Sequence, residues 1–362
     1  MRTMSGWRLG ARRSNPPSFA AIDLGTNNCR LLIATPRRRG FRVVDAYSRI
    51  VRLGEGVSRN GALSDAAMER TTDALKVCAQ KMAARQVRAS RCIATQACRA
   101  ASNGQEFLDR IRTDLGLKLE MVTAEEEASL SVKGCHDLVD ANARAVMVFD
   151  IGGGSTEISW LTVRRGRDRR IKMDLAAWVS LPVGVVTLAE RHGDVDMSRE
   201  AFDAMAADVA QQVRAVAVPE EVRAAFDKGA AHLVGTSGTV TSLAGVHLGL
   251  KRYVRREVDG LWLGQQDAAG VAERLRHMSY ADRALEPCIG EDRADLVVPG
   301  CAILEGILRA WPASRIRVGD RGLREGLLID LMNEWRDRRA EKCASNNRAK
   351  NRKGKKVPRP SA

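Results

Sequence analysis

The chain has 362 residues, 44% of them hydrophobic and 28% charged, which is enough for about two globular domains. Aromatic residues make up only 4%, which argues against a surface that stacks nucleic-acid bases, and no apolar run is long enough to span a membrane. The net charge is +15, but residues 1–18 and 342–362 carry twelve Lys and Arg and no acid, which leaves +3 for residues 19–341. We therefore expect a nearly neutral folded body between two disordered basic ends.

The eight cysteines contain no CxxC pair, and the N-terminus lacks the apolar segment of a secretory signal. This combination predicts reduced thiols in a cytoplasmic protein, most of them small core residues.

The first predicted elements form a strand, a Gly-rich turn and a second strand, followed by alternating helices and strands. In chain order we expect strands at 19–23, 30–34 and 42–47, a helix at 64–84, a strand at 87–95 and a helix at 96–114.

The same unit then returns. A strand at 145–150 ends in an Asp, residues 151–156 form a Gly-rich turn, and a strand follows at 157–163. Because the two units share one formula, we expect two similar α/β domains. The remaining expected elements are strands at 178–181, 231–234 and 316–318, a third Gly-rich turn at 235–242, and helices at 198–215, 266–278, 293–311 and 322 to about 339.

Three glycine loops are suited to holding phosphate, because glycine lets backbone N–H groups approach closely and Ser or Thr adds hydroxyls. They lie at 25–28, 152–156 and 235–239, and the first two follow Asp23 and Asp150. An acid beside a phosphate site typically holds Mg²⁺. A single loop of this kind is usually only a tight turn, but three favour phosphate binding. Neither a Walker A motif nor a GxGxxG fingerprint is present.

These loops, together with further stretches, resemble the exopolyphosphatase/guanosine pentaphosphate phosphatase family, in the actin–Hsp70–sugar kinase superfamily. The matching stretches are 21–28, 95–99, 125–128, 149–157, 181–185, 235–239 and 322–326. The resemblance covers about residues 19 to 335. It implies an α/β fold with two ribonuclease H-like domains, 19–126 and 127–321, separated by a cleft, with the terminal helix 322–340 as a candidate to pack back on the first domain.

The resemblance also implies roles for particular residues. Glu127 matches the family's general base, whereas Glu126 belongs to a capping box with Thr123 and is explained by helix initiation. Glu157 and Asp150 are expected to assist catalysis, and Asp23, Asp150 and Glu157 to hold Mg²⁺ or another divalent cation. Arg324 is expected to be structural. The expected phosphate-binding set is Gly25, Thr26, Asn27, Asn28, Arg99, Gly153, Gly154, Ser155, Thr156, Gly235, Ser237, Gly238 and Thr239.

The favoured activity is removal of the terminal orthophosphate from inorganic polyphosphate by Mg²⁺-assisted attack of water. The alternative substrate is guanosine pentaphosphate (pppGpp), and no sequence feature separates the two. An alarmone-binding regulator and a superfamily kinase are further alternatives. The expected partner is thus polyphosphate or pppGpp, with no membrane and no specific nucleic acid, and the resemblance allows a homodimer.

Overall fold

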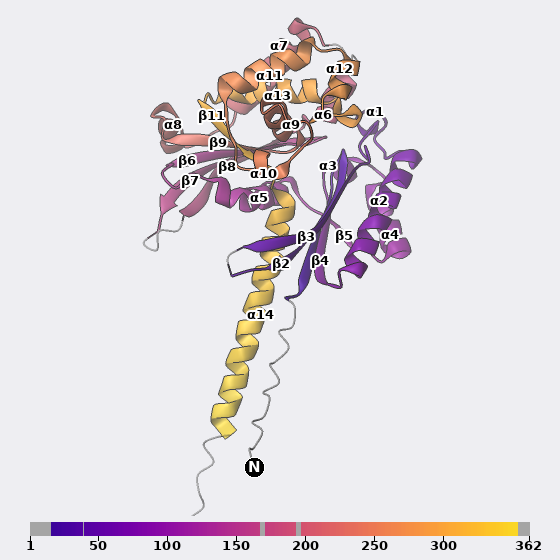
Figure 1. Cartoon of the computed structure of the whole chain (residues 1–362), viewed down its shortest axis with the longest axis vertical. Coiled ribbons are helices and arrows are strands. Elements are labelled where there is room, and N and C mark those ends of the chain that lie inside the picture. Colours follow the sequence, from indigo (N-terminus) through magenta and orange to yellow (C-terminus); the bar gives the residue numbers. More distant parts are fainter. Residues whose placement is uncertain (1–15, 39, 167–170, 193–196, 354–362) are drawn as a thin grey trace, which may run out of the picture.

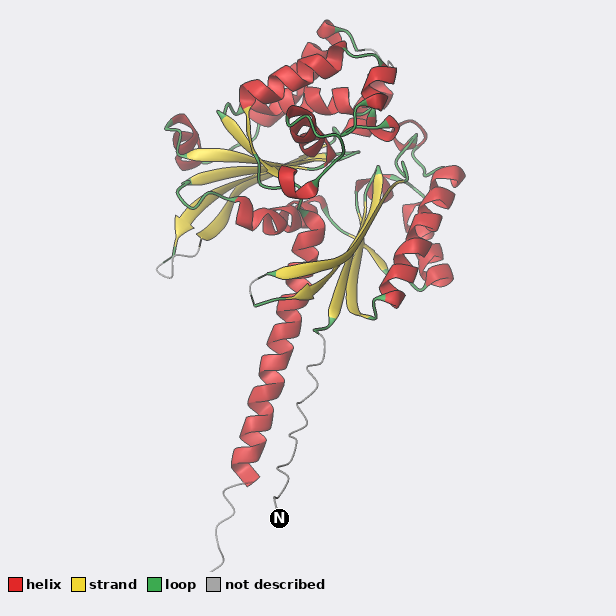
Figure 2. Ribbon diagram, in the orientation of Figure 1, coloured by secondary structure: helices red, strands yellow, loops and turns green. Residues whose placement is uncertain are grey.

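The computed structural model describes residues 16–38, 40–166, 171–192 and 197–353, which form two β-sheets with helices packed against them (Figure 2). Of the ends predicted to be disordered, 1–18 and 342–362, residues 1–15 and 354–362 lie outside the described residues, whereas Ser18 begins the first strand and residues 342–353 are helical. The first sheet has the order β3-β2-β1-β4-β5 and the second β10-β11-β9-β6-β7-β8. The strands are β1 (Ser18–Leu24), β2 (Asn28–Pro36), β3 (Phe41–Ile50), β4 (Val87–Ala94), β5 (Leu119–Met121), β6 (Ala145–Ile151), β7 (Thr156–Arg165), β8 (Ile171–Leu181), β9 (Ala231–Thr236), β10 (Trp262–Gly264) and β11 (Arg315–Gly319).

The two sheets repeat one topology. In the first sheet β1, β2 and β3 run antiparallel in succession, while β4 and then β5 add in parallel beside β1. In the second sheet β6, β7 and β8 follow the same antiparallel path, β9 and β11 add in parallel beside β6, and β10 extends the edge. The repeated strand–turn–strand formula of the sequence therefore predicted two similar α/β domains correctly, and their shared topology agrees with the ribonuclease H-like fold that the family resemblance implied.

Helices cover the sheets in layers (Figure 1). They are α1 (Val57–Asn60), α2 (Asp65–Ala84), α3 (Gln96–Ala100), α4 (Gly104–Leu115), α5 (Ala124–Cys135), η1 (His136–Leu138), α6 (Val185–His192), α7 (Arg199–Arg214), α8 (Glu220–Asp227), α9 (Gly238–His247), α10 (Arg255–Val258), α11 (Gln265–His277), α12 (Tyr280–Leu285), η2 (Glu291–Arg293), α13 (Val297–Ala310) and α14 (Leu323–Lys353). None of the helices within the described residues is both long and apolar enough to cross a membrane.

Strand β1 shows how the first sheet is placed between two layers. Ala20, Ile22 and Leu24 join the core beneath α2, α3 and α4. Phe19 and Ala21 point the other way, into a cluster with Leu327 and other residues of α14. Because successive side chains of a strand alternate between faces, Asp23 belongs to the α14 side, at the carboxyl end of the strand. The alternation thus delivers the acid to the space between the two domains.

The terminal helix is longer than expected. We predicted an end near Arg339 and no structure from 345, but α14 continues to Lys353. Residues 340–353 contain no Gly or Pro, and Ala, Lys, Arg and Glu are good helix formers, so basic low-complexity composition does not stop the helix. The first stop residue is Gly354. In Figure 1 the distal part of α14 extends away from both domains.

The predicted helix at 96–114 is broken into α3 and α4. Ala101 is extended, and the Ser102 amide donates to the Gly61 carbonyl. The Asn103 side chain accepts from the Leu63 amide and donates to the Leu63 carbonyl. Residues 101–103 thus leave the helical conformation and hydrogen-bond to the loop before α2. Local hydrophobic periodicity does not reveal this long-range contact.

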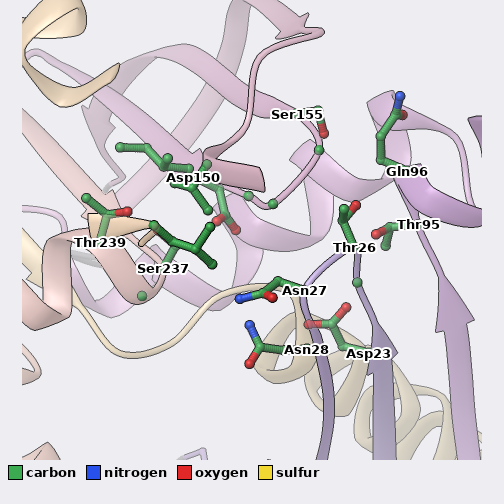
Figure 3. A pocket seen from close by; sticks show the side chains of 18 of the residues that line it. Asp23, Thr26, Asn27, Asn28, Thr95, Gln96, Asp150, Ser155, Ser237 and Thr239 are labelled. Atoms are coloured by element: carbon green, nitrogen blue, oxygen red, sulfur yellow. The ribbon is translucent and has the colours of Figure 1, made fainter. Parts of the chain in front are cut away.

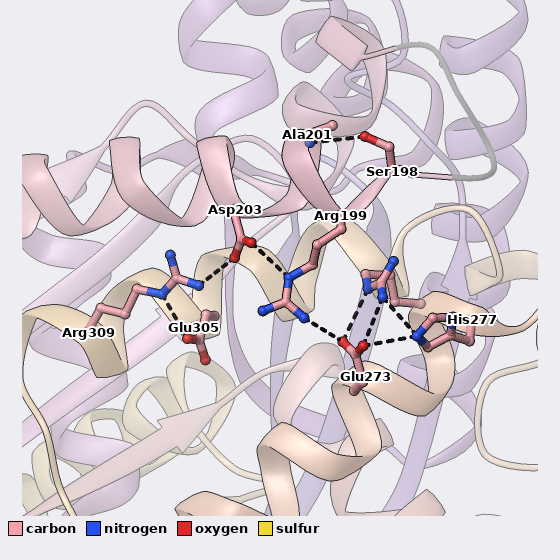
Figure 4. A network of polar contacts seen from close by, with 9 residues as sticks. Ser198, Arg199, Ala201, Asp203, Glu273, His277, Glu305 and Arg309 are labelled. Carbon is pink, nitrogen blue, oxygen red and sulfur yellow. Dashed lines mark hydrogen bonds and ion pairs between the residues drawn. The ribbon is translucent and has the colours of Figure 1, made fainter.

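A surface network joins the outer helices of the second domain (Figure 4). Asp203 of α7 accepts from Arg199 and from Arg309 of α13, and Glu273 of α11 accepts from Arg199 and His277. Exposed pairs of this kind contribute little individually, about 0–1 kcal/mol. The main stabilisation of these helices is therefore the apolar core.

Candidate active site

The turns of the two equivalent hairpins face each other across the domain junction. A Cβ atom on Gly153 would lie 3.0 Å from Cβ of Thr26, and one on Gly154 would lie 2.7 Å from Thr26 Oγ1. Glycine is therefore required at 153 and 154 by the close approach of the opposite loop. In Figure 3, Asp23, Thr26, Asn27 and Asn28 approach the cavity from the first domain, opposite Asp150 and Ser237 of the second.

Both turns have the same backbone design. The Gly25 amide donates to the Asn28 carbonyl and the Gly152 amide to the Ser155 carbonyl, each at 2.9 Å. Between these bonds, several amides donate to no acceptor in the described parts of the chain: those of Thr26, Asn27, Gly153, Gly154 and Ser155. Unpaired amides gathered in a turn are suited to binding phosphate oxygens.

The third glycine loop differs from the expected turn. Gly235 and Thr236 end β9, Ser237 has a φ of 93°, and Gly238 and Thr239 begin α9. The backbone thus passes directly from strand to helix and presents a helix N-terminus, where amides are also free. The Ser237 hydroxyl is buried and has no hydrogen-bond partner among the described residues, as is also true of Oδ1 of Asn27 and of Asn28.

A cavity of about 110 Å³ lies where these elements meet. At about 30 Å³ per water molecule it has room for a few waters or a phosphoryl group, but not for a nucleotide. The following predicted residues line it: Asp23, Gly25, Thr26, Asn27, Asn28, Glu127, Asp150, Gly153, Gly154, Ser155, Glu157, Ser237, Gly238 and Thr239.

Three predicted phosphate-binding residues are not part of the cavity wall. The Thr156 hydroxyl, in β7, is buried and donates a hydrogen bond to the Val183 carbonyl. A Cβ on Gly235 would meet the Phe149 ring at 2.5 Å, so this glycine serves sheet packing. Arg99 lies behind Glu127 instead of facing the cavity. Thr156 lies between the lining residues Ser155 and Glu157, and strand alternation turns its side chain away from the cavity.

Arg99 holds the candidate base in place. Its Nη1 lies 2.9 Å from Glu127 Oε2 and 2.7 Å from the Val122 carbonyl, and its Nη2 donates to Gln96. Burial raises the pKa of Glu127 well above its ordinary value, and the charge of Glu157 adds to this, while Arg99 opposes it. A glutamate with a raised pKa is a stronger base in its ionised form.

Glu157 is more deeply buried, with a side chain in the interior of the site. Its Oε1 accepts from Ser155 Oγ at 2.7 Å and from Ser180 Oγ at 2.8 Å. Burial, together with the charge of Asp150, raises its pKa to about 7, against the lowering effect of the Ser155 hydrogen bond. Glu157 therefore changes protonation near neutral pH.

Asp23 and Asp150 occupy equivalent places in the two domains. In the register of the hairpins Asp23 is opposite Arg30, and Asp150 is opposite Glu157. Burial raises the pKa of both aspartates, while the charge of Arg30 lowers it. Asp150 Oδ2 also accepts from Ser131 Oγ at 2.9 Å.

The carboxylates of the site could supply only one or two of the ligands of a Mg²⁺ ion. The described residues contain no group of three or more His, Cys, Asp or Glu placed to enclose a metal. Mg²⁺ commonly keeps several waters and is held by one or two carboxylates together with substrate phosphates. Asp23 and Asp150, which line the cavity from opposite sides, and the unpaired Oδ1 atoms of Asn27 and Asn28 are oxygen donors of the required type.

Sequence reasoning missed several lining residues, among them Arg30, Thr95, Gln96, Ser242 and Arg293. Arg30 could have been predicted from the sequence, because a hairpin with a turn at 25–27 places it opposite Asp23. Arg293 carries no local signal. It reaches the cavity from the segment before α13, far away in the sequence.

The model of the Ppx/GppA phosphatase family matches residues 32–335 of this chain. The chain belongs to this family. A curated relative from Photobacterium profundum, named guanosine-5'-triphosphate,3'-diphosphate pyrophosphatase, is 30% identical over 322 residues, covering 88% of this chain and 60% of the relative. The chain thus spans about three-fifths of the length of that Ppx/GppA relative.

Two solved Ppx/GppA structures are similar over almost their whole length. An exopolyphosphatase-like protein is 30% identical, with a TM-score of 0.74, covering 88% of this chain and 99% of that one. The Aquifex aeolicus family member is 25% identical, with a TM-score of 0.70, covering 88% and 98%. The fold expected from the sequence is therefore that of the family.

Proposed function

We propose that this Ppx/GppA protein hydrolyses the terminal 5′-phosphoanhydride bond of guanosine pentaphosphate and releases orthophosphate. The observation that carries the proposal is the small cavity in which unpaired amides of two loops surround a space bordered by Glu127. Curated relatives from several organisms bear the name guanosine-5'-triphosphate,3'-diphosphate pyrophosphatase, which supports this substrate over the polyphosphate that the sequence favoured.

In the proposed reaction Glu127 takes a proton from the attacking water. Its carboxylate is held by Arg99, so that it borders the cavity in a set orientation. The amides of both turns stabilise charge that develops on the transferring phosphoryl oxygens. Glu157, with a pKa of about 7, is suited to hold or return a proton on the same wall.

We propose Mg²⁺ as the cofactor, held by Asp23 and Asp150. When bound, it neutralises charge on substrate phosphate oxygens. Without a cation, the carboxylates around the cavity would repel a polyanion.

Inorganic polyphosphate is the second candidate substrate. It is favoured by the likeness to the exopolyphosphatase-like structure, almost all of which this chain matches. Both substrates present the same terminal group to the cavity.

The test measures orthophosphate release with Mg²⁺ from guanosine pentaphosphate, long-chain polyphosphate and GTP, by wild type and Glu127→Gln. We expect the highest kcat/KM for guanosine pentaphosphate, and a fall in kcat of about 10²–10⁴-fold in the variant, since general-base catalysis contributes that much. Glu126→Gln serves as the control and should retain activity, because Glu126 is half-buried, pairs with Arg91 and does not line the cavity.

Higher kcat/KM for polyphosphate would move the assignment to the second candidate. Tight nucleotide binding without release would support a regulator, and transfer of the phosphoryl group from ATP to an acceptor would support a kinase.

A further inference from the structure

A groove of about 270 Å³ lies where the beginning of β1 and β4 meet α14, and it shares no lining residue with the cavity of the candidate active site. Four apolar residues and four cations line it: Phe19, Ala89, Leu331 and Trp335, and Arg88, Arg338, Arg339 and Lys342. We call it the basic groove. Because Phe19 lies near the first residue of β1 and Asp23 near the last, the basic groove and the candidate active site lie toward opposite ends of this strand.

Three of the four cations in the basic groove have no ion pair. Arg338 pairs with Glu334 at 2.9 Å. Arg88, Arg339 and Lys342 are exposed and form no ion pair with any residue that the structure describes. The groove therefore has a surplus of positive charge that an anionic partner would match.

The cations of α14 lie on the side of the helix that lines the groove. The lining residues of this helix follow one another at intervals of three or four positions, which places them on one helix face: Leu331, Trp335, Arg338, Arg339 and Lys342. The acids of the same stretch repeat at similar intervals and line no part of the groove: Glu334, Asp337 and Glu341. The helix thus separates its charges and turns the positive side toward the groove.

Trp335 gives the groove a planar apolar surface. Its ring meets the ring of Phe19 edge to face, with centroids 5.8 Å apart, and the guanidinium carbon of Arg339 lies 4.8 Å from its centroid. Trp335 is only partly buried. Unstacked nucleic-acid bases stack on aromatic rings and on Arg guanidinium planes. Aromatic residues are scarce in the sequence, but the fold combines one of them with arginine here.

Both basic ends of the sequence join the folded body at this groove. Ser18 leads directly into Phe19, and Lys342 is the lining residue from which α14 continues to Lys353. Residues 1–18 carry four Arg, and residues 342–362 carry eight Lys and Arg, with no acid in either segment. The fold therefore attaches most of the net positive charge of the chain to one place.

These features fit a long polyanion that also has apolar parts. Positive charge continues beyond the groove along the distal part of α14, which extends away from both domains (Figure 1). Inorganic polyphosphate has no group that would use the apolar lining. A membrane would require large apolar residues on the helix, and residues 343–353 contain none. A nucleic-acid strand supplies both phosphates and planar bases.

We propose that the basic groove binds single-stranded nucleic acid without sequence preference. Phosphates contact Arg88, Arg339 and Lys342, and a base stacks on the surface that Trp335 and Arg339 form. The strand then continues along the distal part of α14. This is a binding site separate from the candidate active site, and it does not depend on the proposed hydrolysis.

The test measures the dissociation constant of a labelled single-stranded RNA by fluorescence anisotropy at several salt concentrations. The RNA has about 20 nucleotides, longer than the 4–16 that one binding domain commonly covers. The full-length variants are Trp335→Leu and the double variant Arg88→Gln/Arg339→Gln. Arg112→Gln is the matched control, because Arg112 is an exposed arginine of α4, which packs on the opposite face of the first sheet.

We expect the double variant to bind more weakly and to lower the slope of log Kd against log salt concentration by about 1.4, because each phosphate contact of a single strand contributes about 0.7. Trp335→Leu should weaken binding at least about fivefold with an unchanged slope, as the loss of one stacked base predicts. Arg112→Gln should change neither quantity.

A duplex RNA of the same length separates base stacking from charge. Its bases are paired and stacked on one another, so Trp335→Leu should leave its dissociation constant unchanged. An equal loss with duplex and single strand would overturn the proposal. So would a loss that Arg112→Gln reproduces, unchanged affinity in both groove variants, or binding of phosphatidylserine vesicles without binding of RNA.

The melting temperature of each variant shows whether it is folded. Arg88 and Arg339 have no ion pair to lose among the described residues, so the double variant should melt with wild type. It tests the groove through the salt slope even if Trp335→Leu does not fold.

Discussion

The four acidic residues of the site differ from ordinary Asp and Glu because they are buried. Asp23, Glu127, Asp150 and Glu157 all have raised pKa values with burial as the largest cause. Burial of several carboxylates together disfavours their ionised forms, so a cation that arrives with the substrate would stabilise them.

Glu157→Gln should reveal the cost of burying an ionised carboxylate, through the pH dependence of the free energy of unfolding. The folded protein binds the Glu157 proton more tightly than the unfolded chain, so the free energy of unfolding falls as pH rises from about 4.5 to about 7. Above that range the buried carboxylate costs up to about 3 kcal/mol. Glutamine keeps the oxygen that accepts from both serines, so we expect the variant to gain roughly 1–3 kcal/mol over wild type at pH 8 and almost nothing at pH 4.5.

The measurement is chemical denaturation without Mg²⁺ at both pH values. An equal stability difference at the two values would show that Glu157 does not titrate in this range.

At the level of elements, two contacts join the domains on the side of the site where the loop after β3 meets the second domain. Arg52 makes two hydrogen bonds to Asp295, at 2.8 and 3.1 Å, just before α13. Glu190 of α6 accepts from the Gly56 amide at 2.7 Å and from the Ser58 hydroxyl. The cavity between the glycine turns has no room for a nucleotide, so the domains would have to open to admit one. Opening would break these contacts between the loop after β3 and the second domain.

Asp295→Asn should therefore affect substrate capture more than chemistry. The pair is partly exposed, so its contribution is about 1 kcal/mol or less, and we expect KM to rise by about two- to fivefold with little change in kcat. Steady-state kinetics checks this, with Asp174→Asn, which breaks an exposed pair on the distant edge of the second sheet, as the control. A fall in kcat with unchanged KM would contradict a role in holding the domains closed.

For the whole molecule, α14 links the domains. Its buried residues Leu327 and Leu328 pack against the first sheet, and Lys133 of α5 pairs with Asp330. Beyond Trp335 no residue of α14 belongs to a hydrophobic cluster of the described residues. The distal helix thus adds length and positive charge to a core that is already complete.

Removing residues 343–362 should consequently leave the melting temperature within about 2 °C of wild type, because none of the described side chains in this segment belongs to a hydrophobic cluster. Leu328→Ala in the full chain, by contrast, should lower the free energy of unfolding by about 2–5 kcal/mol, because it empties a fully buried site. Calorimetry of both proteins tests this. A large destabilisation on truncation would mean that the distal helix has a partner in the folded protein.

The sequence by itself determined the repeated hairpins, the acids at their strand ends and most of the glycine-loop residues that line the cavity. These are local properties: alternation puts Asp23 and Asp150 at corresponding positions, and both Gly-rich turns close with the same backbone hydrogen bond between their first and fourth residues. The motifs also carried the family resemblance. Reading them as polyphosphate motifs was a choice between substrates that share a terminal phosphoryl group.

Only the tertiary structure decided which side chains face the cavity. Arg99 contacts Glu127 and Thr156 contacts Val183 instead of lining the cavity, although both belong to matching motifs. Arg30 and Arg293, in contrast, both line it from segments that are far apart in the sequence. Directions and long-range convergence depend on how sheets and helices pack, and no local pattern encodes them. Burial, which raises the pKa values of the carboxylates, likewise exists only once both domains have closed around the site.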